Sequence, residues 1–71
     1  MINTGKIKGR LRELGLTQSD VARALGLAQP TVAQKINRVR PMTVEEAEKL
    51  SQLLKISNEE FSAYFFAEQF A

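Results

Sequence analysis

Apolar residues recur along the chain with the spacing of α-helices, and short polar or glycine-containing segments interrupt them. In the first segment Ile7, Leu11 and Leu14 recur at i, i+4 and i+7, so they form one stripe on a helix. Asn3 or Thr4 is placed to cap the start of this helix. The pattern predicts an amphipathic helix at the start of the chain.

Glycine, proline and capping residues divide the following segment into two more short helices. Gly15 and Gly26 are placed to end helices in the left-handed conformation, which glycine adopts without a steric penalty. Thr17 is a favourable N-cap residue, and Pro30 is tolerated in a first helical turn. We therefore expect a second helix from Thr17 to Gly26 and a third over about residues 28–37. The side chains expected to face inward are Val21, Ala22, Leu25, Leu27, Val32 and Ile36.

Two capping boxes open the last two helices. Residues 43–46 and 57–60 each place a hydroxyl at the N-cap and a glutamate three residues later. The expected apolar stripe of the fourth helix is Val44, Ala47, Leu50, Ser51 and Leu54. The fifth helix, over about residues 58–70, carries every aromatic residue of the chain. No segment alternates long enough for a strand, so the predicted fold class is all-α, with five helices in a single domain, residues 1–71.

Composition argues against most kinds of catalytic or metal site. The chain contains neither cysteine nor histidine, so thiolate and imidazole ligands are absent. The clustered carboxylates Glu45, Glu46 and Glu48 lie in a first helical turn, where the helix dipole and solubility explain them. We expect no enzymatic activity, no cofactor and no metal ion. The longest apolar run, residues 63–67, is too short to span a bilayer, so we expect a soluble cytoplasmic protein.

Basic side chains concentrate in the first part of the chain. Residues 1–40 carry eight basic and two acidic side chains, whereas residues 41–71 carry two basic and six acidic ones. The division indicates a basic face suited to a polyanion and an acidic side turned away from it. The alternative is that these charges only keep the helix surfaces solvated. The same two interpretations apply to Lys6, Lys8 and Arg10, which can bind phosphates or simply face solvent.

Two of the predicted helices, separated by a turn of about four residues, form a helix-turn-helix. Ala22 is small where the two helices cross, and Gly26 permits a positive φ in the turn. A Leu-Thr-Gln run at 16–18 precedes the first helix, and Gln-Pro-Thr-Val at 29–32 opens the second. With these residues the chain resembles the Cro/cI-like family of phage repressors and related bacterial regulators, over roughly residues 5–62.

The resemblance implies a compact five-helix bundle of the phage repressor DNA-binding domain type, with the helix-turn-helix over about residues 17–37. It implies a transcription regulator, a repressor of phage or bacterial origin, that binds double-stranded operator DNA as a homodimer and reads half-sites with its third helix. A chain that ends with Phe70 and Ala71, directly after an acidic, aromatic helix, would suit a DNA-binding domain cut from a longer repressor. The alternative is a protein-interaction module on the same fold, an antitoxin or adaptor whose main partner is another protein.

Four positions depart from the family pattern. Ala28 stands where relatives usually have a polar cap, and Arg38 stands where they often have a glycine after the third helix. Leu11 and Ile36 stand where many relatives hold an arginine and a glutamate. We expect these two apolar side chains to pack directly against each other in place of a buried ion pair.

Helical geometry assigns roles to the side chains of the third helix. At about 100° per residue, Gln34 points away from the stripe of Val32 and Ile36. Glutamine can pair with adenine, and threonine or proline can cover a thymine methyl, although an exposed glutamine can also simply solvate a helix. The base-reading candidates are Gln29, Pro30, Thr31, Gln34 and Lys35. The phosphate-binding candidates are Thr17, Gln18, Asn37, Arg38 and Arg40.

Aromatic residues lie on both faces of the predicted fifth helix. At about 100° per residue Phe61, Tyr64 and Phe65 make one apolar face, and Phe66 and Phe70 lie on the opposite one. A helix at the surface of a bundle needs only one apolar face. We therefore expect Phe66 and Phe70 to form the contact of a symmetric dimer. Fraying of the chain end, or docking on a further domain, is the alternative.

Overall fold

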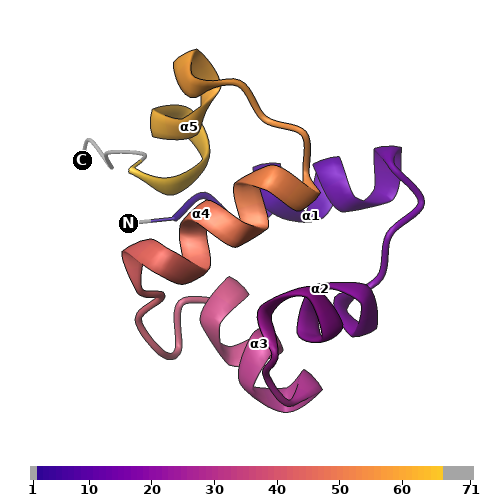
Figure 1. Ribbon diagram of the computed structural model, residues 1–71. Helices are drawn as coiled ribbons and strands as arrows, with labels where there is room; N and C mark the ends of the chain where they lie inside the picture. The colour runs from indigo at the N-terminus through magenta and orange to yellow at the C-terminus, as the bar shows by residue number, and fades with distance from the viewer. Residues whose placement is uncertain (1, 67–71) are drawn as a thin grey trace.

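The computed structural model describes residues 2–66, and within this range the chain forms five α-helices and no strand (Figure 1). The helices are α1 (Thr4–Glu13), α2 (Gln18–Leu25), α3 (Gln29–Ile36), α4 (Val44–Leu53) and α5 (Asn58–Phe65). The prediction of an all-α fold with five helices is confirmed. No helix in the described part of the chain is long and apolar enough to cross a membrane.

The helix starts follow from side-chain caps. Thr17, Thr43 and Ser57 each form a capping box with the acidic residue three positions later, and Asn3 caps α1 by accepting a hydrogen bond from the Lys6 N–H. The predicted capping boxes are confirmed. Helix α3 differs, because Ala28 offers no side-chain acceptor at its N-cap. The first N–H groups of α3 are therefore left for solvent or a bound partner.

The turns after the helices use left-handed backbone conformations. Gly15 and Gly26 both have φ of 69°, as predicted from their places after α1 and α2. Two residues with side chains adopt the same region, Arg38 with φ of 66° and Lys55 with φ of 55°. A side chain in this conformation costs about 1–2 kcal/mol, so both positions carry local strain.

The helices are arranged in two groups that meet at α4. Helix α2 packs against both α3 and α4, and α1 packs against α5. In Figure 1, α2 and α3 lie together at one end of the molecule and α5 lies at the other. The N-terminal residues connect the two ends, because the Asn3 N–H donates to the Tyr64 carbonyl at 2.7 Å and the Thr4 hydroxyl donates to the Ile36 carbonyl at 2.6 Å.

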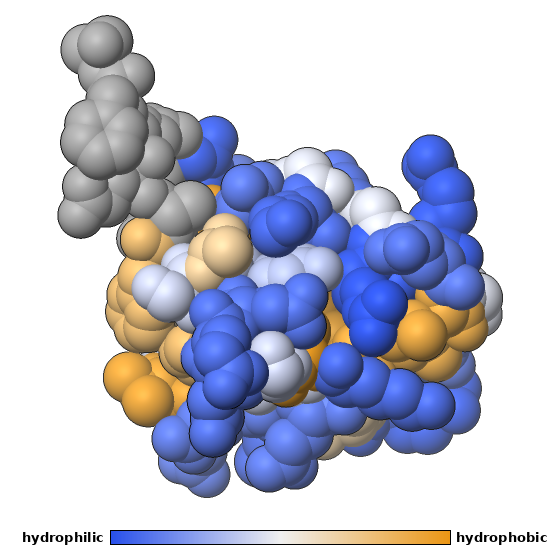
Figure 2. Space-filling model, turned by 90° about the horizontal axis from the view of Figure 1, so that it is seen from above, coloured by the Kyte–Doolittle hydropathy of each residue, from blue (hydrophilic) through white to orange (hydrophobic). Residues whose placement is uncertain are grey.

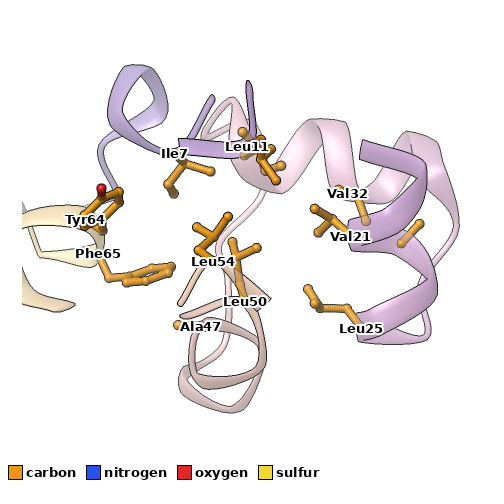
Figure 3. Packing of buried hydrophobic residues seen from close by; sticks show 12 residues of the cluster. Ile7, Leu11, Val21, Leu25, Val32, Ala47, Leu50, Leu54, Tyr64 and Phe65 are labelled. Atoms are coloured by element: carbon orange, nitrogen blue, oxygen red, sulfur yellow. The ribbon is translucent and has the colours of Figure 1, made fainter. Parts of the chain in front are cut away.

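One apolar core joins all five helices. Figure 3 shows Leu50 and Leu54 of α4 between the aromatic side chains of α5 and the side chains of α2. The buried residues are Ile7, Leu11, Val21, Ala22, Leu25, Val32, Ile36, Ala47, Leu50, Leu54, Tyr64 and Phe65. Leu11 and Ile36 are 4% and 0% exposed and belong to the same cluster, and their direct contact stays a prediction.

The predicted interior position of Val44 is wrong. Its side chain is 66% exposed, whereas Ala47, Leu50 and Leu54 are buried as expected. Val44 is the first residue of α4, directly after the cap, and the buried side of the helix begins at Ala47. Helical spacing alone cannot detect this, because it gives the direction of a side chain and not how far along the helix the core extends.

The predicted inner face of α5 is confirmed, since Tyr64 and Phe65 are buried and Phe61 packs partly buried against the core. The helix ends at Phe65, and Phe66 is its C-cap with φ of −128°. Within the described residues α5 is therefore shorter than the predicted 58–70. Phe70 lies outside the described residues.

Candidate nucleic-acid interface

Helices α2 and α3 pack against each other as a two-helix unit. Gly26 turns the chain in the left-handed conformation, and the Leu27 N–H donates to the Ala22 carbonyl at 3.0 Å. Val21 and Val32, one from each helix, are buried beneath the turn. The turn and the apolar contact together fix the position of α3 on α2.

The solvent side of α3 carries most of the base-reading candidates. Gln29, Pro30 and Gln34 are exposed and Thr31 is half-exposed, while the opposite side of the helix is buried through Val32 and Ile36. The outward direction predicted for Gln34 is therefore confirmed. An eight-residue helix that presents two glutamines and a threonine on one side has the donors and acceptors needed to read base edges in a major groove.

Lys35 is placed differently from the other candidates. Its ammonium lies 2.6 Å from the Glu46 Oε1, and the two side chains are only 13% and 17% exposed. The hydrogen bond from Lys35 is the main reason why the pKa of Glu46 lies below its ordinary value, and the N–H of Thr43 adds to it. Because its charge is directed to α4, we remove Lys35 from the base-reading set. Helical spacing cannot predict this pair, since Glu46 comes from another helix.

Thr17 is also used within the protein. Its N–H and its hydroxyl donate to the Asp20 Oδ2 at 2.8 and 3.0 Å, and these bonds lower the pKa of Asp20. Both donors of Thr17 are therefore engaged in the cap of α2. We assign Thr17 to the positioning of α2 and remove it from the phosphate-binding set.

Gln18, a phosphate-binding candidate, is the first residue of α2 and is half-buried. It borders a surface depression of about 360 Å³ together with Lys8 and Arg12 of α1. Two cations beside the first turn of α2 suit a backbone phosphate. The sequence prediction assigns no ligand to Arg12, because the depression that it lines with Gln18 is a feature of the folded chain.

The other two basic residues of α1 point elsewhere. The Arg10 Nε donates to the Leu54 carbonyl at 2.9 Å and the Arg10 Nη2 to the Lys55 carbonyl at 3.4 Å, so this side chain caps the end of α4. The Lys6 ammonium lies 5.0 Å from the centre of the Tyr64 ring. Both cations therefore stabilise the fold on the side of α4 and α5.

The loop after α3 brings the remaining phosphate-binding candidates close to Gln34. The Gln34 carbonyl accepts hydrogen bonds from the N–H groups of Val39 and Arg40, at 2.8 and 3.2 Å. The left-handed conformation of Arg38 makes this return possible. Asn37, Arg38 and Arg40 are all exposed on this loop, which places two cations at the end of the helix that carries Gln34.

A groove of about 430 Å³ separates this loop from the end of α5. Its apolar walls include Val39 and Phe66, which are 71% and 56% exposed, and its basic walls include Arg38 and Arg40. The predicted exposure of Phe66 is confirmed, but its ring lies 5.7 Å from the Phe61 ring, so the predicted separation of these two rings on opposite faces is wrong. Phe66 is the C-cap of α5, with a backbone that is no longer helical.

The face seen in Figure 2, from the α5 end of the molecule, is mostly hydrophilic, with separate apolar patches at its edges. Among residues 2–66, no group of three or more acidic side chains could hold a metal ion. At the other end of the molecule, the exposed basic side chains next to α3 are Arg38 and Arg40, and their charge suits a polyanion.

Comparison with known proteins agrees with this geometry. A family model described as helix-turn-helix matches residues 7–61, which include the whole of α2, α3 and α4. The comparison with curated proteins gave no match. The resemblance that residues 16–18 and 29–32 indicate is therefore confirmed over most of the chain.

Proposed function

Since this chain belongs to the XRE family of helix-turn-helix DNA-binding regulators, as do the phage Cro and cI repressors, we propose that it represses transcription by reading operator DNA as a dimer. Helix α3 enters the major groove, where Gln29, Pro30, Thr31 and Gln34 contact the bases. The phosphates that border this groove are contacted by Gln18, Asn37, Arg38 and Arg40. The protein is of phage or bacterial origin.

The observation that carries the proposal is the division of α3 into a buried apolar side, packed on α2, and an exposed polar side. Val32 and Ile36 are buried, Gln29 and Gln34 are exposed, and the Arg40 N–H is bonded to the Gln34 carbonyl. A base-reading side chain and a phosphate-binding loop are thereby held in one orientation. Such preorganisation favours a docking geometry in which phosphate contacts set the register of the base contacts.

The second copy of the chain, in this proposal, packs against the groove between the α3–α4 loop and α5. Phe66 and Val39 are the large apolar side chains exposed there, and exposed apolar patches on a small domain mark association surfaces. Phe70, which lies outside the described residues, remains part of the proposed contact. A dimer places two copies of α3 at half-sites about one helical turn, ~34 Å, apart.

Selection of bound sequences from a random duplex pool, followed by titration of the selected duplex and of a random duplex at two salt concentrations, tests the proposal. We expect the selected sites to contain two related half-sites, and binding to weaken steeply with salt because phosphate contacts release counterions. A folded protein that binds no duplex at low salt would contradict the proposal and favour a protein-interaction module.

A further inference from the structure

The C-terminal half of α3 is held by polar contacts that come from outside the helix-turn-helix. The Ile36 carbonyl accepts a hydrogen bond from the Thr4 hydroxyl at 2.6 Å, and the Lys35 ammonium lies 2.6 Å from the Glu46 carboxylate. Lys35 and Ile36 directly follow Gln34 in the chain. The end of the helix that carries the proposed base reader is therefore fastened to α1 and to α4.

Glu46 makes two connections at once. Its Oε1 accepts the hydrogen bond from Lys35 and also one from the Thr43 N–H at 3.0 Å, as the third residue of the capping box that opens α4. The ion pair therefore joins α3 to the rigid first turn of α4. Both side chains are more than four-fifths buried, which limits screening of the pair by solvent and salt.

We infer that the Lys35–Glu46 ion pair is a positioning device, which sets the orientation of α3 and so determines how well Gln34 distinguishes one base pair from another. The inference rests on the proposed function. Neither residue contacts DNA in this role. Loss of the pair leaves α3 attached to α2 through the apolar core, but its last turn can move relative to the bases.

The chain supplies a matched control for Glu46. Glu60 occupies the same position in the capping box that opens α5, where it accepts hydrogen bonds from the N–H and hydroxyl of Ser57 at the protein surface. Glutamine can replace glutamate in a capping box. Glu46→Gln and Glu60→Gln therefore make the same change to a helix cap, and only Glu46→Gln also removes the charged partner of Lys35.

The experiment compares wild type with Glu46→Gln, Glu60→Gln, Lys35→Met and the double variant Lys35→Met, Glu46→Gln. Two quantities are measured in the folded proteins: amide hydrogen exchange along α3 without DNA, and the ratio of affinities for the selected duplex and a random duplex. We expect Glu46→Gln to speed exchange in the last turn of α3 several-fold. The affinity ratio should fall about five- to tenfold, which is less than the full discrimination that one bidentate base contact can provide.

Glu60→Gln should change neither the hydrogen exchange of α3 nor the affinity ratio. The fall in affinity ratio in the double variant should be no larger than in either single variant. A folded Glu46→Gln protein with the wild-type affinity ratio overturns the inference, as does an equal loss in Glu60→Gln. If wild type itself does not discriminate between duplexes, the proposed function fails and the specificity role fails with it. Unchanged hydrogen exchange in Glu46→Gln would, independently of DNA, refute the fastening of α3.

Discussion

The Arg40 N–H donates a hydrogen bond to the Gln34 carbonyl at 3.2 Å, so the backbone of a residue that can bind a phosphate is tied to that of the residue best placed to read a base. The loop between them returns to the helix instead of leaving it. In the proposed complex, a phosphate contact by Arg40 would therefore constrain where Gln34 meets the major groove. Mutation can separate the two proposed contacts, because a base contact depends on the DNA sequence and a phosphate contact does not.

Gln34→Ala should weaken binding to the selected duplex by about 1–3 kcal/mol and relax the preference at one or two base pairs. Arg40→Ala should weaken binding to all duplexes alike and lower the salt slope by about one. Titration of each variant with selected and random duplexes at several salt concentrations measures both effects. An equal loss on both duplexes for Gln34→Ala would show that this residue does not read bases.

Lys55→Gly should stabilise the protein by about 0.5–1 kcal/mol. Lys55 has φ of 55°, and glycine removes the steric penalty of that conformation at some cost in unfolded-chain entropy. Lys49→Gly, at an exposed interior position of α4, should instead destabilise by about 1 kcal/mol. Urea unfolding measures the free energy of unfolding of both variants, and the comparison requires that their m-values equal that of wild type. A Lys55→Gly protein less stable than wild type would show that the backbone strain at Lys55 costs less free energy than the added entropy of glycine in the unfolded chain.

Ile36→Glu should destabilise the protein by about 3–5 kcal/mol, because it places an uncompensated carboxylate among buried apolar side chains. If Leu11 contacts Ile36 directly, the double variant Leu11→Arg, Ile36→Glu should recover part of this loss. Unfolding of the two single variants and the double variant gives the coupling free energy. Strictly additive losses would mean that the two side chains are not neighbours.

Stability should fall at acid pH through Glu46 and Asp20. The pKa of each is lowered in the folded state, from ordinary values of 4.5 and 3.8, by hydrogen bonds from Lys35 and Thr17 respectively. Both groups therefore contribute stability above these ordinary values and lose it as the pH falls through the lower folded pKa. Urea midpoints measured between neutral pH and about pH 3 should be flat at first and then decline. Glu46→Gln should show a shallower decline, and an unchanged profile would argue against the Lys35 contact.

Phe66→Glu should prevent association of the chain. The Phe66 side chain is 56% exposed at the groove, and a carboxylate in an apolar contact between copies would be desolvated without a partner. Sedimentation at micromolar concentration, with and without the selected duplex, compares this variant with wild type. Val44→Glu is the control, because Val44 is also an exposed large apolar residue but does not line the groove. A wild type that stays monomeric even on DNA would refute the dimer.

Local signals explain what the sequence predicts well. The capping boxes at Thr43 and Ser57 and the left-handed turn at Gly26 depend on residues within four positions of each other, so they can be recognised along the chain. The outward direction of Gln34 can also be predicted from nearby residues. It follows from helical periodicity once Val32 is known to be inside.

Contacts between helices explain what the sequence misses. The pairing of Lys35 with Glu46 and the capping of α4 by Arg10 join side chains from different helices, and many cations in the chain could have taken these places. The same holds for Arg12, which lines one surface depression together with Gln18 of α2. Charge and spacing identify such residues as candidates, and tertiary packing decides which of them face the proposed ligand.

The hydrogen bonds from the first turns of the chain have a consequence for biosynthesis. Asn3 donates to the Tyr64 carbonyl, and Arg10 donates to the Leu54 carbonyl across 44 residues. Helix α1 therefore completes its native contacts only when α4 and α5 are in place. While α5 is still inside the ribosomal exit tunnel, the partner of α1 is missing. The five helices consequently cannot complete their fold until α5 has emerged from the tunnel.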